Sequence, residues 1–163
     1  MRRHTLTFSL ILAALLVIAP PVQAQTDLDF KVGPRVTADV ADISGTAIGA
    51  NLRLLSGTFP VQASGAFDVY VSESDATVFT VDLNAQYLIN LNEQWFSPYV
   101  GAGGGLTRVS GLEGEGSTTD LGFNLVGGAE IDTRFVTPFA QTQLTLGSTF
   151  DRLGFTAGLL INL

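Results

Sequence analysis

The chain has 163 residues, a length that suits one domain. Its 15 acidic residues outnumber 8 basic ones and leave a formal net charge of −7, which argues against nucleic acid as a partner. There is no cysteine, and this excludes disulfides, cysteine nucleophiles and an acylated lipobox.

Residues 1–24 have the features of a cleaved secretory signal. Arg2 and Arg3 give a positive start, an apolar run follows from Leu6 to Ala19, and Val22 to Ala24 has the small-x-small form of a cleavage site. A membrane helix is the alternative, but a span needs about 20 apolar residues. Residues 25–163 are the predicted mature domain. It contains six basic residues and all 15 acidic ones, which gives a net charge of −9.

The first predicted strand covers residues 28–40, where apolar and polar side chains alternate with the period of two expected of a strand. Lys31 and Arg35 share one face with Asp29 and Asp39, so charges of both signs lie together. Pro34 removes one ladder donor, and a local bulge or distortion is expected there. Strands 46–55 and 61–72 follow with the same alternation.

The segment 77–91 shows the alternation most clearly. Phe79, Val81 and Leu83 belong to an apolar face, whereas Asp82 and Asn84 belong to a polar one. The segment is long for a soluble strand, which usually has about 5–6 residues. It suits a tilted strand in a bilayer, which needs about 9–11 residues.

The remaining predicted strands are 96–110, 120–131, 136–147 and 153–163. The glycine-rich run at 101–105 lacks the Lys-Ser/Thr of a phosphate loop and indicates a bent strand. No helical periodicity follows residue 24, and a closed barrel is the non-helical way to span a bilayer. The predicted fold is therefore all-β, an eight-stranded antiparallel up-and-down transmembrane β-barrel. The even strand number puts both termini at one end, expected to be periplasmic.

The polar face of these strands predicts a lumen filled by side chains, because an eight-stranded barrel is just wide enough to hold them. We expect Asp68 and Asp82 to pair there with Lys31, Arg35 or Arg53, since buried lone charges are costly. Inward glycines leave a narrow conduit open as an alternative. The predicted lumen network consists of Asp29, Lys31, Arg35, Asp39, Asn51, Arg53, Asp68, Asp82, Asn84, Gln86, Asn124, Glu130, Gln141 and Gln143.

Catalytic chemistry finds little support in the sequence. The single histidine, His4, lies in the predicted signal, so the mature domain lacks Ser-His triads and the usual zinc ligands. We therefore expect no enzyme and no cofactor. The acidic segments 72–76 and 111–119 are predicted to be solvated loops, with divalent bridging to lipopolysaccharide phosphates as a weaker alternative.

Taken together, the chain resembles the small eight-stranded outer-membrane proteins of the OmpA-like and OmpX-like β-barrel family. The resemblance rests on the signal, the eight alternating segments, the stretch Pro98–Leu106 and the tail. Thr156, Gly158, Ile161 and Leu163 are similar to the family's terminal assembly signal, with Leu163 where the family usually has Phe. The resemblance implies the bacterial outer membrane, contact with its lipid and lipopolysaccharide, and assembly by the barrel-assembly machinery.

Three functions remain open at this point. The first is a non-enzymatic outer-membrane protein, expected to be a monomer, with a structural or surface-interaction role and a plugged lumen. The second is a small-solute channel of porin type. The third is a soluble lipocalin-type barrel, in which the polar face would lie outside and the apolar face would line a ligand cavity.

Overall fold

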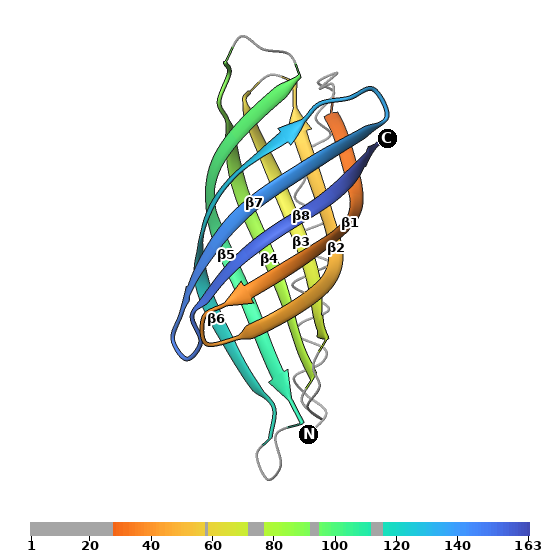
Figure 1. Cartoon of the computed structure of the whole chain (residues 1–163). Helices are drawn as coiled ribbons and strands as arrows, with labels where there is room; N and C mark the ends of the chain where they lie inside the picture. Colours follow the sequence, from red (N-terminus) through yellow and green to blue (C-terminus); the bar gives the residue numbers. More distant parts are fainter. Residues whose placement is uncertain (1–27, 58, 72–76, 92–94, 112–115) are drawn as a thin grey trace, which may run out of the picture.

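Eight antiparallel strands form a closed barrel in the computed structural model, which describes residues 28–57, 59–71, 77–91, 95–111 and 116–163. Each strand pairs with the next in sequence, and β1 pairs with β8 (Figure 1). This confirms the predicted fold. Within these residues, no helix is long and apolar enough to cross a membrane. The strands are β1 (Leu28–Val40), β2 (Ser44–Ser56), β3 (Val61–Val71), β4 (Thr77–Leu88), β5 (Phe96–Ser110), β6 (Thr118–Ile131), β7 (Val136–Gly147) and β8 (Arg152–Asn162).

The predicted strand bounds agree with these closely, because the turn residues that end each strand are readable in the sequence. The largest difference lies at β4, which the sequence predicts to reach residue 91 but which ends at Leu88. A second difference lies at β8, which begins at Arg152 and so includes a residue predicted to lie in a turn. The predicted signal at 1–24, the loop 72–76 and most of the acidic part of 111–119 lie outside the described residues.

Pro34 distorts the pairing on one side of β1 only. The β1–β2 ladder continues through Pro34 opposite Ala50. The β1–β8 ladder instead skips Gly33 and Pro34, then resumes at Arg35 opposite Gly158 in the same register. The distortion is therefore a local loss of pairing, not a bulge.

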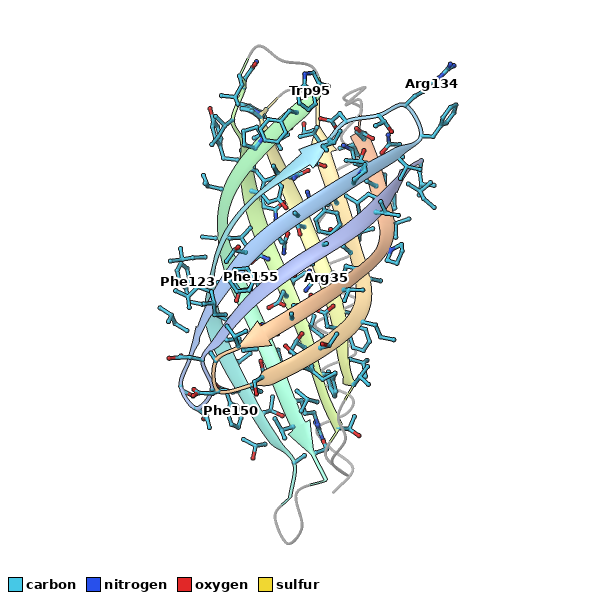
Figure 2. All side chains as sticks on the ribbon, viewed as in Figure 1. Arg35, Trp95, Phe123, Arg134, Phe150 and Phe155 are labelled. Carbon is cyan, nitrogen blue, oxygen red and sulfur yellow. The ribbon has the colours of Figure 1, made fainter. Side chains whose placement is uncertain are left out.

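The alternation places polar side chains inside the barrel and apolar ones outside. Of the buried side chains in the described residues, 23 are polar or charged and 9 are apolar. Figure 2 shows Arg35 within the barrel, whereas Phe123 and Phe155 project outward. A lipocalin-type barrel needs the reverse arrangement, so the structure argues against that alternative.

The two ends of the barrel differ in their connections. The near end, uppermost in Figure 1, holds the start of β1, the end of β8 and the turns after β2, β4 and β6. The far end holds the connections after β1, β3, β5 and β7. Trp95 and Phe96 pack against each other at the near end, with ring centroids 5.7 Å apart. Both termini of the barrel thus share one end, as predicted from the even strand number.

Candidate functional site

The interior of the barrel is the candidate site, and thirteen of the fourteen predicted network residues are buried in it. Asp29 is the exception and is exposed. The reason is its position at the rim, because Lys31 is the first residue of β1 that pairs with β8. The buried thirteen are Lys31, Arg35, Asp39, Asn51, Arg53, Asp68, Asp82, Asn84, Gln86, Asn124, Glu130, Gln141 and Gln143.

Glu130 is the acceptor at the centre of the near half of the lumen. Lys31 Nζ lies 3.4 Å from its Oε2 and Arg53 Nη1 lies 3.4 Å from its Oε1. Gln62 donates from Nε2 to the same Oε1 over 3.1 Å. Lys31 also donates to Asp132 over 2.9 Å. One carboxylate on β6 thus balances two cations that lie opposite each other on the neighbouring strands β1 and β2, which makes the near half a coupled network.

Arg53 is fully buried and fixed on several sides. Its guanidinium carbon lies 4.7 Å from the ring centroid of Tyr99 and 4.3 Å from that of Phe139, both within cation–π range. Its Nε donates to Asn51 Oδ1 over 3.0 Å, and its Nη2 donates to the Tyr99 hydroxyl over 2.8 Å. These contacts with the guanidinium explain why Tyr99 and Phe139 point inward in the polar near half of the lumen.

A second group of charges occupies the middle of the lumen. Arg35 makes two hydrogen bonds to Asp68, as predicted, and lies 4.0 Å from Asp82. The main partner of Asp82 is Arg152, whose Nη2 lies 2.8 Å from Asp82 Oδ1. Asn124 donates to the same oxygen over 3.1 Å. Sequence reasoning missed Arg152 because it assigned residues 148–152 to a turn, although Arg152 has the same parity as Thr156 and Gly158.

An apolar cluster lies at the far end of the lumen, beyond these charges. The buried members come from β2, β3, β5 and the β1–β2 connection, and two partly buried side chains pack against them. Tyr70 belongs to the cluster and also donates its hydroxyl to Asp39. We call this group the far-end cap: Ile43, Ala47, Tyr70, Val78, Val109 and Phe150.

The two ends of the lumen are therefore unlike each other. At the near end the side chains are polar: Ser97 donates to Asp132 over 2.6 Å, and Thr137 donates to Asn162 over 3.1 Å. At the far end they are apolar. The described residues contain no group of three His, Cys, Asp or Glu side chains that could hold a metal ion. The paired charges of the interior can stabilise the fold, and the described residues, which include neither His nor Cys, offer no nucleophile–base pair of the Ser-His or Cys-His kind.

The residues of the predicted assembly signal occupy both faces of β8. Thr156 points inward and its hydroxyl lies 2.9 Å from that of Thr37, and Gly158 lies beneath the ring of Phe139. Ile161 and Leu163 are exposed outside. The Leu163 amide donates to the Phe30 carbonyl over 2.9 Å and extends the seam with β1. Recognition of these residues by an assembly machinery stays a prediction.

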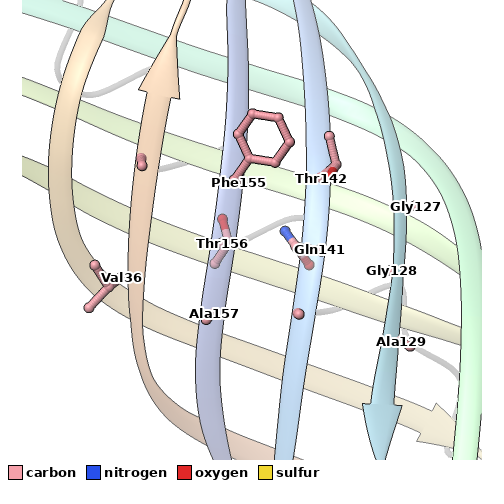
Figure 3. Close-up of a pocket in the computed structure, with 11 residues that line it drawn as sticks. Val36, Gly127, Gly128, Ala129, Gln141, Thr142, Phe155, Thr156 and Ala157 are labelled. Atoms are coloured by element: carbon pink, nitrogen blue, oxygen red, sulfur yellow. The ribbon is translucent and has the colours of Figure 1, made fainter.

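The outer wall carries a shallow recess of about 610 Å³ across β1, β6, β7 and β8 (Figure 3). Small residues form its floor, among them Gly127, Ala129, Ala140 and Ala157, with Phe155 on its edge. The recess faces away from the lumen and holds no charged side chain, so it adds no chemistry to the interior network.

Solved structures that match this fold include those of three proteins. The N-terminal β-barrel domain of Pseudomonas aeruginosa OprF matches with a TM-score of 0.66 and 15% identity, over 82% of this chain and 97% of that one. The chain has the fold of the small eight-stranded outer-membrane β-barrels. Ail, the attachment invasion locus protein of Yersinia pestis, matches with a TM-score of 0.62 and 14% identity, over 85% of this chain and 99% of that one. Neisserial surface protein A matches with a TM-score of 0.60 and 13% identity, over 82% of this chain and 96% of that one.

These likenesses confirm the predicted resemblance at the level of the fold. No protein-family model and no curated protein sequence matches the chain. The role of the barrel must therefore be argued from its own residues.

Proposed function

We propose that the chain is a monomeric, integral protein of the bacterial outer membrane with a structural or surface-interaction role, and that its lumen does not conduct. The near end faces the periplasm and the far end faces outward. Export through the signal at 1–24, insertion by the barrel-assembly machinery, and contact with outer-membrane lipid and lipopolysaccharide belong to this proposal. It includes neither catalysis nor a cofactor.

One observation carries the proposal: the lumen is filled by paired charges and capped by apolar side chains. Buried in it are Lys31, Arg35, Arg53 and Arg152, each within 4.0 Å of a carboxylate. An ion crossing the barrel has to displace these pairs and the far-end cap as well. A channel needs binding weak enough for ions to leave, and this interior offers tight pairs instead.

The interaction role falls to the far end, where the sequence is acidic. Of the six basic residues after the predicted signal, only Arg108 lies outside the lumen near this end, where it donates to Ser117 over 2.9 Å. One of the Ail structures is a complex with the heparin analogue sucrose octasulfate. For this chain we expect no binding of such a polyanion, because the far-end loops carry Asp42, Glu113 and Glu115.

Planar-bilayer recording tests the proposal. The refolded protein is first shown to run as a heat-modifiable band, which reports a folded barrel, and is then added to a bilayer that has been checked with a general porin. We expect no conductance steps above the bare bilayer. Discrete steps from the folded protein contradict the plugged lumen and favour the small-solute channel. Solubility without detergent contradicts the membrane location.

A substitution on the outer wall tests separately whether the barrel spans a bilayer. Leu83 lies halfway along β4 and is 66% exposed, whereas Leu121 lies near the far end of β6 and is 71% exposed. We expect Leu83→Arg to lower the free energy of unfolding in lipid vesicles by about 2–4 kcal/mol and Leu121→Arg by about 0–1 kcal/mol. Urea titration followed by the fluorescence of Trp95, the single tryptophan, measures both. Equal effects of the two variants count against a membrane-spanning barrel.

A further inference from the structure

The carboxylate of Asp120, on β6, holds most of the connection between β7 and β8 at the far-end cap. Asp120 accepts hydrogen bonds from the amides of Ser148, Thr149 and Phe150, at 3.3, 2.9 and 2.9 Å, and from the Ser148 hydroxyl at 2.5 Å. Three successive amides converging on one anion form the kind of concavity that binds anions in proteins. Asp120 thus restrains the whole connection from the neighbouring strand β6.

A second set of bonds joins this connection to the one between β1 and β2. The Asp42 amide donates to the Asp151 carbonyl over 3.2 Å, and the Asp151 amide donates to Asp42 Oδ2 over 2.9 Å. Both sets lie beyond the strand ladders, because the β7–β8 pairing ends at Thr145 opposite Arg152. Such rim bonds open at a lower free energy than the strand ladders themselves.

Phe150 is the part of this connection that closes the lumen. Its side chain is half-buried and packs against the four buried residues of the far-end cap, at the lower end of Figure 2. Beneath the cap, three buried polar atoms make no hydrogen bond within the described residues: Thr80 Oγ1, Asp82 Oδ2 and Arg152 Nε. Buried atoms of this kind gain hydrogen bonds when water reaches them. Displacing Phe150 gives water a route to them.

We propose that residues 148–151 are a hinged lid over the far end of the lumen, with Asp120 as its latch. When the latch is released, Phe150 leaves the cap, and water enters from the outside as far as Thr80 and the Asp82–Arg152 pair. Arg152 directly follows the lid, so movement of the lid also loosens the salt bridge to Asp82. This inference goes beyond the proposed function, because it assigns a movable element to a barrel otherwise described as plugged.

Cysteine labelling tests the lid, since the chain has no native cysteine. Thr80→Cys places a thiol beneath the cap, and Ser97→Cys places one at the near end as a reference. Both are treated in detergent with a small charged methanethiosulfonate reagent. We expect Asp120→Ala to raise the labelling rate of the residue-80 thiol by roughly 10- to 100-fold, because bonds to a charged group are lost. Labelling at residue 97 is expected to stay the same.

Two further variants keep the result interpretable. Asp132→Ala removes a carboxylate at the near end, where it bonds Lys31 and Ser97, and should leave labelling at residue 80 unchanged. Phe150→Ala removes the ring but keeps the latch, and carries the test if Asp120→Ala does not give a heat-modifiable barrel. Unchanged labelling in folded Asp120→Ala and Phe150→Ala overturns the lid. Fast labelling in the parent also overturns it, since no seal then exists. Conductance of the parent protein is a separate readout. It tests the proposed non-conducting lumen and does not bear on the lid.

Discussion

Replacing Arg53 by Met is expected to lower the free energy of unfolding by about 3 kcal/mol, because it leaves a buried carboxylate without one of its cations. Met keeps an unbranched side chain at this position but loses the guanidinium that lies against the rings of Tyr99 and Phe139. It loses the charge that lies 3.4 Å from Glu130 and the donors to Asn51 and Tyr99. Urea titration in lipid vesicles, followed by Trp95 fluorescence, measures the loss.

The double variant Arg53→Met with Glu130→Gln separates charge balance from packing. Lys31 keeps Asp132 at 2.9 Å when Glu130 is neutral, so removing both charges leaves no buried ion alone. We expect the double variant to be more stable than Arg53→Met by at least about 1 kcal/mol. Effects that simply add would show that the two side chains act independently, against the network described here.

Replacing Gly33 by Ala is expected to cost at least about 3 kcal/mol or to prevent closure of the barrel, because the seam between β1 and β8 has no space for a side chain. A Cβ on Gly33 would lie 1.8 Å from the Leu159 carbonyl oxygen and 2.8 Å from its carbon, both backbone atoms. One of the two strands must therefore move at the place where the ladder is already interrupted. The measurement is the heat-modifiable band, followed by urea titration of any folded protein.

Gly127→Ala is the matched control for the seam. A Cβ on Gly127 would meet nothing within 4 Å, since the residue faces the recess in the outer wall. Its effect on unfolding is expected to stay within about 0.5 kcal/mol. Similar losses in both variants would mean that glycine itself is required in these strands, irrespective of the space around it.

The sequence predicts the strands of this barrel well because each residue's face follows from its parity along the strand. Lys31, Arg35 and Asp82 lie inside as their positions indicate, and Leu83 lies outside. Parity says nothing about which strand lies across the lumen. For this reason Asp82 could be expected to pair with an inward cation, but its main partner, Arg152, could not be identified from alternation alone.

The burial of residues at strand ends is predicted less well, because the sequence does not distinguish a residue in an exposed turn from one at the rim of the barrel. Asp29 has inward parity but lies before the first β1–β8 pair, so it meets water. Ile43 and Phe150 lie in segments that resemble polar turns, yet they belong to the far-end cap. Their burial depends on how two connections fold back over the lumen, which is a property of the closed barrel and not of either segment.

The long sequence separation of the lumen ion pairs constrains how the barrel can form. Lys31 and Glu130 are 99 residues apart, and Arg152 and Asp82 are 70 apart. These pairs join β1 to β6 and β8 to β4 across the lumen, and contacts of this range slow folding. A single hairpin entering hydrocarbon would carry its unpaired charges and open strand edges with it, at a high cost. Under the proposed membrane location, the chain therefore has to cross the bilayer and close into a ring in one concerted step, with the charged side chains neutralised as they are enclosed.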